Sequence, residues 1–356
     1  MVRVSNLRDI SPIEYATMLK SVLTFQHGGC FMTSPDIQTH TKKVSIQERS
    51  VLVGDIIVVS GHRVNKALLK GRFTEGGYHI QQTEHFLLFT RSEHPSTILV
   101  HTFAPEEINA DIKHYIMQEL KPLGILTQSQ QYGEILVGIV TTFFPDDIRR
   151  SWTYYGANTL QRFLTFLSTV STPPPPPYTN MGGFVVQYQR VCELCTGATF
   201  LDAGCESGFL PLLIAERMPF MERVVGVDIR PDMFVVVKEL AQERHFTNVR
   251  FVKHDLLDAN FSEIGTFDTV VALNVVEHFT EKDMYRLIAN LLHVTSQRLI
   301  LTVPYEQEAE DLYEHKQIFT KVKLEQVGQW CLQHLNGAGK MWCEDCAGGL
   351  LLIERR

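Results

Sequence analysis

Phe200-Leu-Asp-Ala-Gly-Cys-Glu-Ser-Gly-Phe-Leu210 joins two apolar runs through a turn that contains two glycines. We expect a buried strand to end near Leu201 and a helix to run from Leu210 to Met218. Glycine lets the backbone approach a ligand closely, and a helix N-terminus offers N–H groups that have no partner within the helix. The segment therefore predicts a nucleotide-type ligand at the end of a strand.

Glu206 distinguishes this turn from a dinucleotide-binding loop, whose fingerprint has three glycines. Glu206 stands where the middle glycine would be, and its carboxylate would repel a pyrophosphate at short range. A ligand that carries a sulfonium and an amino acid group, and no phosphate, avoids this repulsion. Asp202 can accept hydrogen bonds from a ligand amine or hydroxyl. These residues favour S-adenosylmethionine (SAM) over a nicotinamide dinucleotide.

The next apolar runs also end in polar side chains. Asp228 ends a run that begins at Arg223, Asp255 follows a third run, and Asn274 closes a fourth. The spacing from Asp202 to Asp228 is close to the ~20 residues expected when an acid at the end of a second strand binds a ribose. Helical patterns lie between these runs, and residues 298–304 form a fifth. This alternation predicts a parallel sheet whose ligand lies at the carboxyl ends of the strands.

With these motifs in this order, residues 198–356 resemble class I SAM-dependent methyltransferases. The resemblance implies a Rossmann-like α/β domain over residues 184–356, with a mostly parallel seven-stranded sheet and helices on both faces. It also implies that the backbone near Gly204 contacts the methionine part of SAM, that Asp228 binds the ribose and that Asp255 lies near the adenine amine. The cofactor-binding residues predicted in this way are Asp202, Gly204, Glu206, Gly208, Asp228, Ile229, Asp255, Leu256 and Asn274.

Length and composition indicate two globular domains. The chain has 356 residues, of which 44% are hydrophobic and 21% are charged. Its net charge of −7 argues against a general nucleic-acid-binding surface, which would be basic. No apolar run approaches the ~20 residues that span a bilayer, and the N-terminal residues lack a signal-peptide core. We expect a soluble, cytoplasmic protein with a small-molecule partner.

The proline run in residues 171–179 predicts an extended, semi-rigid spacer. With the following Gly182 and Gly183 it defines a linker over residues 171–183, after which Phe184 begins a helix that ends near Cys195. The linker separates the methyltransferase-like region from residues 1–170.

Residues 1–170 predict an α+β domain with an antiparallel sheet. Apolar stretches recur between turn signals, and the composition of the first is strongly strand-like. The stretches are residues 50–60, 86–90, 97–103 and 133–144, with helices expected over 108–120 and 158–167.

Three segments of this half are similar to the chorismate pyruvate-lyase fold: residues 84–89, 98–105 and 121–126, the last of which contains the pocket residue Leu123. In that family an Arg opens the first segment and grips the substrate carboxylate, whereas Glu84 stands here. The late catalytic Glu falls near Thr142 or Phe143. Because an acid in place of Arg reverses the electrostatics for an anionic substrate, we expect small-molecule binding or packing rather than lyase activity. A bifunctional lyase–methyltransferase and an unrelated α+β domain are the alternatives.

The chain has seven cysteines, and four of them form the pairs Cys192/Cys195 and Cys343/Cys346. Two such pairs have the ligand count of a structural zinc site. The first pair lies in a predicted helix and the second beside the last strand, and these elements need not be neighbours. We therefore predict buried or reduced thiols, and no metal.

Methyl transfer from a sulfonium is an in-line displacement, so the protein mainly positions the acceptor and, for a hydroxyl, supplies a base. The predicted reaction is methyl transfer to a small organic acceptor, with a hydroxyl oxygen favoured over an amine or carbon. His278 is the candidate base because it titrates near neutral pH. The predicted catalytic residues are Glu277, His278, Tyr305 and His315, all of which follow the fourth and fifth strands.

An alternative comes from Asn274-Val-Val-Glu-His278 and Glu314-His315, which resemble the metal site of small-RNA terminal 2′-O-methyltransferases. In that site two Glu and two His hold a divalent ion. Glu277, His278 and His315 match three of the four ligands, and Asn274 replaces the first Glu. An amide contributes no charge, so cation affinity should fall. A SAM-binding protein without catalytic activity is a further alternative.

Overall fold

The computed structural model describes most of the chain after residue 49 and divides it into two compact units. The N-terminal unit comprises Met1–Ile108 and Ile112–Tyr155, and the C-terminal unit comprises Asn109–Asp111 and Gly156–Arg356. The proline run lies outside the described residues. These residues are 50–54, 56–62, 67, 70–71, 74, 78–91, 94–126, 129–169, 180–306 and 314–356.

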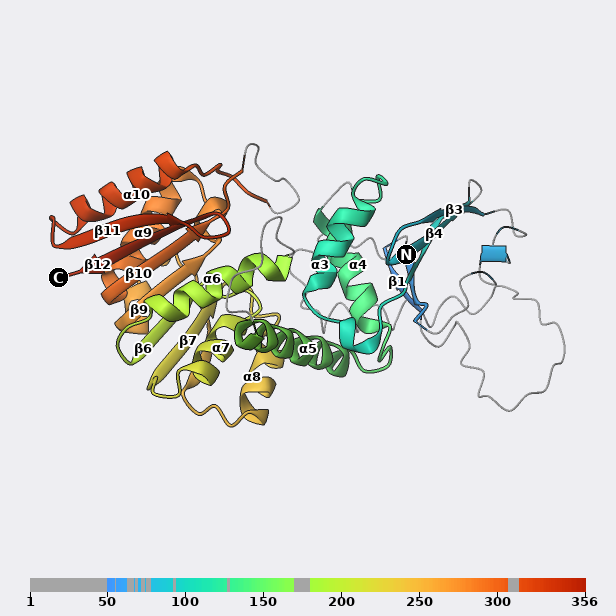
Figure 1. Cartoon of the computed structure of the whole chain (residues 1–356), viewed down its shortest axis with the longest axis horizontal. Coiled ribbons are helices and arrows are strands. Elements are labelled where there is room, and N and C mark those ends of the chain that lie inside the picture. The colour runs from blue at the N-terminus through green and yellow to red at the C-terminus, as the bar shows by residue number, and fades with distance from the viewer. Residues whose placement is uncertain are drawn as a thin grey trace. The chain divides into compact units, whose positions relative to one another are not determined.

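A seven-stranded sheet in the order β11-β12-β10-β9-β6-β7-β8 forms the centre of the C-terminal unit (Figure 1). The five strands β6 to β10 are parallel, and β12 is antiparallel to both of its neighbours. The predicted mostly parallel sheet of seven strands is confirmed. The strands are β6 (Thr199–Ala203), β7 (Arg223–Asp228), β8 (Val249–Lys253), β9 (Phe267–Leu273), β10 (Thr295–Val303), β11 (Gly339–Asp345) and β12 (Gly349–Arg355).

Helices cover both faces of this sheet (Figure 1). Alternate strand residues such as Leu201 and Val270 share one core cluster with α9 and α10, whereas α7 packs on β6 and β7 from outside that cluster. Both faces are therefore removed from water, which explains the near-continuous apolar runs of the strands. The helices are α6 (Asn180–Leu194), α7 (Phe209–Arg217), α8 (Phe234–Glu243), α9 (Glu281–Val294) and α10 (Lys321–His334), with short 3-10 turns η5 (Phe261–Ile264) and η6 (Val276–His278).

Helix α6 begins earlier than the sequence predicts. Gly182 and Gly183, assigned to the linker, lie inside the helix. Met181 and Val185 are buried on either side of them, and this packing outweighs the low helix propensity of glycine.

The strand order reverses between β6 and β9. From β6 the chain continues through β7 to β8 in one direction, and β9 then pairs with the other edge of β6. In open α/β sheets the ligand crevice lies at the carboxyl ends of the strands at such a switch point. The loop after β6 and the turn after β9 are therefore expected to flank one site.

The N-terminal unit contains a five-stranded sheet in the order β1-β2-β5-β4-β3. The pair β2–β5 is parallel and the other pairs are antiparallel, so the predicted antiparallel sheet is a mixed one. The strands are β1 (Ser50–Val53), β2 (Ile56–Ser60), β3 (His79–Gln82), β4 (Phe86–Arg91) and β5 (His94–His101).

Two predictions for this unit are wrong in detail. The apolar stretch 50–60 is two strands rather than one, because the chain reverses at Gly54, whose φ of 55° suits glycine. The stretch 133–144 is mostly helix α4 (Ser129–Thr141), which packs Ile135 and Ile139 against β1 and β2.

The predicted helix over 108–120 is α3 (Asp111–Tyr115) followed by the π-helix η4 (Ile116–Leu120). Helix α5 (Ile148–Thr169) is longer than predicted, and the short 3-10 turn η3 (Pro105–Glu107) precedes α3.

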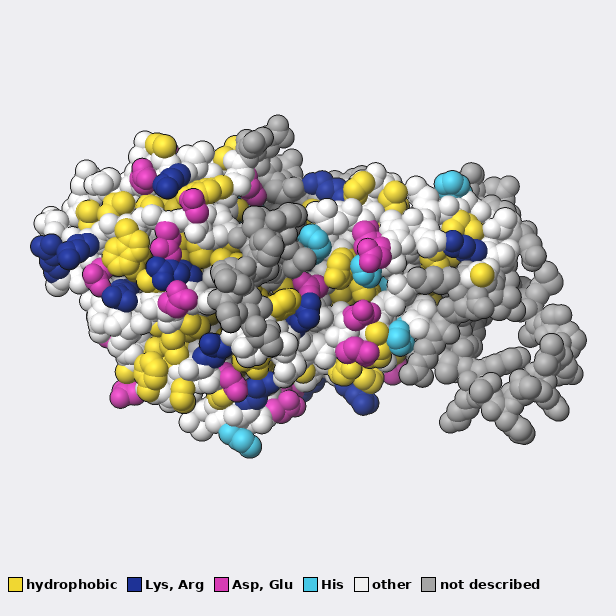
Figure 2. Space-filling view, in the orientation of Figure 1, with side chains coloured by type: hydrophobic (Ala, Val, Ile, Leu, Met, Phe, Trp, Pro, Cys, Tyr) yellow, Lys and Arg dark blue, Asp and Glu magenta, His cyan; other side chains and the backbone are white. Residues whose placement is uncertain are grey.

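Among the described residues, no helix combines the length and the apolar character that a membrane span requires. On the face seen in Figure 2, the Lys and Arg side chains are interspersed with Asp and Glu side chains. The described side chains on this face form no continuous basic area.

Asp268, at the start of β9, joins three neighbouring strands. Its carboxylate accepts hydrogen bonds from the N–H groups of Ala198 and Thr199 and from the side chains of Ser296 and Gln297. Burial acts to raise its pKa, but these hydrogen bonds lower the pKa to about 2. Asp268 thus fixes the starts of β6, β9 and β10 relative to one another.

We predict that Asp268→Ala lowers the free energy of unfolding by about 2 kcal/mol, since hydrogen bonds to a charged group are lost. The folded pKa lies below the unfolded value of ~3.9. The stabilisation should therefore be complete above that value and disappear as the pH falls towards the folded pKa. Denaturant unfolding across this range measures it. The exposed Glu263, changed to Ala, is the control, and an equal effect of both substitutions would contradict the prediction.

Candidate functional site

The loop after β6 turns tightly at two glycines. Gly204 has a φ of 80°, and a Cβ there would lie 2.6 Å from Val275. Gly208 has a φ of 72°, precedes α7, and would place a Cβ 2.6 Å from Phe251. The N–H of Gly204 donates to the carbonyl of Val227 at 2.8 Å. Both positions therefore require glycine, Gly204 for the approach to β7 and the turn after β9, and Gly208 for the approach to β8.

Asp228, the last residue of β7, holds this loop in place. One carboxylate oxygen accepts the N–H of Glu206 and the other accepts the N–H of Arg230, each at 2.8 Å. A carboxylate oxygen has a second lone pair, so both oxygens can still accept ligand hydroxyls. The next residue, Ile229, is 56% exposed, so an apolar side chain is available beside Asp228 for a flat ring.

Asp255 lies in the loop after β8. Its carboxylate accepts the N–H of Leu257 at 2.8 Å, and the N–H of His254 donates to the carbonyl of Asp228. These bonds tie the third loop to the end of β7. Leu256 is buried in the core cluster and so anchors the loop to the core.

Asp202, at the end of β6, is a buried carboxyl group. Burial, and then the nearby Asp228, raise its pKa to about 8. Ionisation of such a group at neutral pH requires a positive partner. A ligand with an ammonium and a sulfonium supplies that charge. The glycine turn, Asp202 and Asp228 thus form a site that fits SAM.

Asn274 follows β9 in a left-handed conformation, with a φ of 52°. Its side-chain amide forms two hydrogen bonds with the amide of Gln187 on α6, with donor–acceptor distances of 3.0 and 3.4 Å. Its oxygen also accepts the hydroxyl of Thr302. Asn274 therefore anchors α6 beside the carboxyl end of β9. The sequence contained a signal for the missed residue Gln187, since a polar side chain occurs there among apolar helix residues.

Glu277, His278 and His315 come together at the same edge of the sheet. One potential ligand atom from each lies within 4.8 Å of the others. Glu277, on η6, is fully buried, and among the described residues none donates a hydrogen bond to either carboxylate oxygen. Burial raises its pKa to about 8, and Glu306 adds to the shift. A carboxylate in this position needs a proton or a cation.

The two histidine rings of this cluster contact each other and neighbouring groups. Their rings meet edge to face with centroids 4.9 Å apart. Burial and the neighbouring His315 lower the pKa of His278, whereas a hydrogen bond to the backbone of Glu314 raises it. His315 Nδ1 lies 2.8 Å from a carboxylate oxygen of Glu306.

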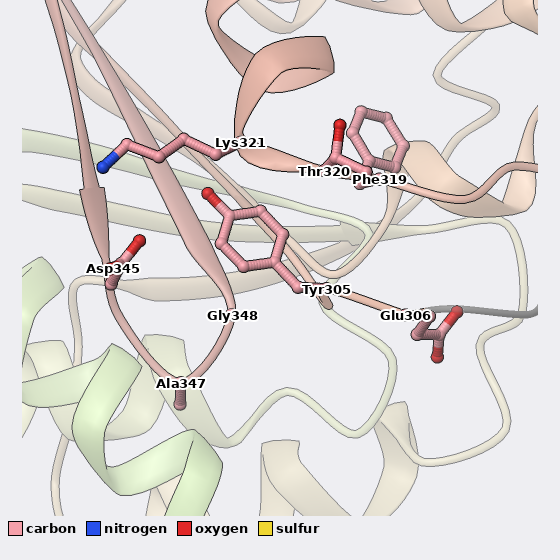
Figure 3. Close-up of a pocket in the computed structure, with 8 residues that line it drawn as sticks. All are labelled: Tyr305, Glu306, Phe319, Thr320, Lys321, Asp345, Ala347 and Gly348. Carbon is pink, nitrogen blue, oxygen red and sulfur yellow. The ribbon is translucent and has the colours of Figure 1, made fainter.

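Tyr305, the fourth predicted catalytic residue, lies in a neighbouring cavity of about 660 Å³. In Figure 3 its hydroxyl points towards the region between Lys321 and Asp345, and Glu306 extends to the other side. Burial and then Asp345 raise the Tyr305 pKa. Tyr305 is thus separate from the histidine pair, and Glu306 both lines the cavity and contacts His315. The remaining lining residues are Phe319, Thr320, Ala347 and Gly348.

No cysteine takes part in a group of three or more potential metal ligands in the described part of the chain. Burial raises the pKa of Cys192 to about 11 and that of Cys346 to about 12, so these thiols are protonated at neutral pH.

A second group of potential ligands, Glu84, His85 and Glu119, lies in the N-terminal unit and was missed from the sequence. Both oxygens of Glu119 already contact His85, one at the backbone N–H and one at Nδ1.

Comparisons with known proteins agree with the site. Residues 200–298 match the family described as "Methyltransferase domain". The C-terminal unit thus contains a methyltransferase domain. SAM is the cofactor of this domain, as the acids and glycines predict. The comparisons do not support the resemblance of the N-terminal half to the chorismate pyruvate-lyase fold.

Relatives of the methyltransferase domain differ in their acceptors. A magnesium-protoporphyrin O-methyltransferase from Rhodobacter capsulatus is 29% identical over 118 residues, which are 33% of this chain and only 50% of that protein. A magnesium protoporphyrin IX methyltransferase from Synechocystis, solved with S-adenosylhomocysteine, matches 60% of this chain and 100% of its own (16% identity, TM-score 0.39). The small RNA methyltransferase HEN1 matches 52% of this chain and 26% of its own (18% identity, TM-score 0.42).

We predict that Asp202→Asn stabilises the ligand-free protein at pH 8 and leaves it unchanged near pH 4. The folded pKa of Asp202 lies above the unfolded value of ~3.9. The folded state therefore binds the extra proton between these values, and the stability of the wild type falls as the pH rises through this window. Thermal unfolding of both proteins from pH 4 to above pH 8 measures the difference. Parallel curves would contradict the prediction. Saturating SAM should reverse the order at pH 8, because only the acid pairs with a cationic ligand.

Proposed function

We propose that this protein transfers the methyl group of SAM to a hydroxyl oxygen of a small organic acceptor. The main support is the cluster of Glu277, His278 and His315, which lies beside the cofactor loop. The loop and the turn that carries the cluster meet where Gly204 packs against Val275, the residue just before η6. The groups that can activate a hydroxyl are thus close to the groups that bind the methyl donor.

The proposed cofactor contacts are those that the methyltransferase resemblance implies, and the loop geometry supports them. Asp228 binds the ribose hydroxyls and Ile229 covers the adenine ring, while Asp255 lies near the adenine amine. Asp202 balances the positive charge of the methionine part. Bound in this way, SAM supplies an electrophilic methyl group on a sulfonium, whose carbon–sulfur bond breaks as the acceptor oxygen attacks.

The acceptor hydroxyl must lose its proton during the transfer. A neutral His278 is a suitable base, and burial keeps the imidazole neutral by lowering its pKa. This is the role expected from the sequence, and it remains a proposal.

The state of Glu277 supports a second means of activation, a divalent cation. A fully buried carboxylate without hydrogen-bond donors among the described residues is costly unless a cation or a proton neutralises it. Glu277, His278 and His315 are oxygen and nitrogen ligands from a single small cluster. A cation there would lower the pKa of a bound hydroxyl and position its oxygen. The residues present fit such an ion, in contrast to the absence of metal expected from the sequence.

The acceptor class follows from the surface and the cluster together. The mixed charges on the face in Figure 2 and the acidic net charge favour a small acceptor over an extended nucleic acid. The ribose at an RNA end is a second candidate, favoured by the three residues that match the metal site of terminal 2′-O-methyltransferases. The name of the Rhodobacter relative also describes methyl transfer to oxygen.

Methyl-transfer assays with labelled SAM separate these acceptors. Small hydroxyl compounds and a short RNA are tested in parallel, the RNA with either a ribose or a 2′-deoxyribose at its 3′ end. Methylation of small hydroxyl compounds supports the first acceptor class. Label on the ribose-ended RNA alone supports the second. Transfer only to amines or carbon would refute an oxygen target.

We predict that Asp228→Ala largely abolishes SAM binding, because it removes the ribose contact and releases the N–H of Glu206 that shapes the loop. Isothermal titration calorimetry measures the affinity. Glu222→Ala, an exposed acid just before the opposite end of β7, is the matched control and should bind SAM normally. Unchanged affinity in Asp228→Ala would show that the ribose contact is wrongly assigned.

We predict that Glu277→Gln lowers the methylation rate by ~100-fold or more while SAM affinity is retained, since a neutral amide removes the only buried charge of the cation site. Wild-type protein treated with a chelator should lose activity to a similar degree and regain it with Mn²⁺. Full activity after chelation would remove the cation from the mechanism and leave His278 as the base.

A further inference from the structure

Glu306 is an acidic residue in direct contact with the histidine pair. Its carboxylate contacts His315 Nδ1 at 2.8 Å, and the two side chains are only 20% and 7% exposed. Such a carboxylate accepts the Nδ1–H and thereby fixes both the tautomer and the orientation of the imidazole. The other ring nitrogen, Nε2, is then the atom that has a lone pair for a ligand.

Backbone contacts hold Glu306 and His315 together across the segment that separates them in sequence. Tyr305 and Phe319 form a β-bridge, one on each side of the pair. The N–H groups of Lys316 and Gln317 donate to the carbonyl of Glu277 at 2.8 and 3.2 Å. The chain segments that carry Glu277, Glu306 and His315 are therefore fixed to one another by the fold.

His278 lies against the same backbone. Glu314, which has a left-handed φ of 59° and immediately precedes His315, adjoins the His278 ring. His315 thus has one ring nitrogen bonded to an acceptor outside the cluster. Metal-binding histidines in proteins show this arrangement as a rule.

Asn274 does not complete the ligand set. Its amide is engaged by Gln187 and Thr302. Two imidazoles and one carboxylate remain, a set with open positions for solvent or an acceptor oxygen. Nitrogen ligands suit transition metals, whereas Mg²⁺ prefers oxygen ligands and keeps its waters.

We infer that Glu306 is the positioning residue of a three-ligand cation site, in which it orients His315 so that Nε2 joins Glu277 and His278 on a transition-metal ion rather than on Mg²⁺. This inference rests on the cation in the proposed function. It assigns to Glu306 a role in cation affinity that does not require contact with SAM or with the acceptor.

Titration of the full-length protein with Co²⁺ tests the inference, because visible absorption of Co²⁺ reports nitrogen ligation independently of catalysis. We expect Glu306→Ala to weaken Co²⁺ binding by ~10–100-fold, as for other residues that orient metal ligands. Glu306→Gln should lose less, because its amide oxygen can still accept the Nδ1–H. Asp345→Asn is the control, since Asp345 lines the same cavity without a hydrogen bond to His315. Calorimetry with SAM checks that each variant is folded.

The outcomes separate this inference from the proposed function. Co²⁺ affinity of Glu306→Ala within about twofold of the wild type, against the expected loss, would overturn the role of Glu306 and leave the cation in place. Tighter binding of Mg²⁺ than of Mn²⁺ or Co²⁺ would overturn the three-ligand assignment. A wild type that binds no Co²⁺ and methylates its acceptor in the presence of a chelator would overturn the cation itself.

Discussion

Burial of two carboxyl groups at one edge of a parallel sheet is the constraint that governs the C-terminal unit. Asp202 is the penultimate residue of β6 and Glu277 lies on η6 after β9, and burial raises the pKa of each to about 8. Among the described residues, neither carboxyl group forms an ion pair with a Lys, Arg or His side chain. The fold thus holds two sites that favour a positive charge, one beside the glycine turn and one between two histidines.

The site between the histidines extends this constraint into the proposed acceptor region. Glu277 is enclosed by η6 and by the segment that carries His315, and backbone hydrogen bonds join these parts. Glu306 connects them in turn to the cavity that contains Tyr305. The proposed donor and acceptor sites are therefore neighbours, because the turn after β9 lies beside the loop after β6.

The sequence predicts the sheet of the C-terminal unit well because its strands and their order depend on local patterns. The apolar run up to Asp202 and the glycine at position 204 predict a strand followed by a tight turn. The parallel order follows from the alternation of strands and helices. The bond from Asn274 to Gln187 and the bond from Glu306 to His315 join distant segments, so no local spacing contains them. The apolar stretch 133–144 of the N-terminal unit is mostly helix. The sequence did not identify it as such, because a short apolar run suits a buried helix as well as a strand.

The contact between Asn274 and Gln187 makes the residue types at these two positions depend on each other. Glu at position 274 would keep acceptors for the Gln187 amide and Thr302, but it would remove the donor to the Gln187 oxygen, which is nearly enclosed. A single exchange would leave that oxygen unsatisfied. Homologues that carry an acid at the first position should therefore carry a different partner on α6, and the two columns of an alignment should covary.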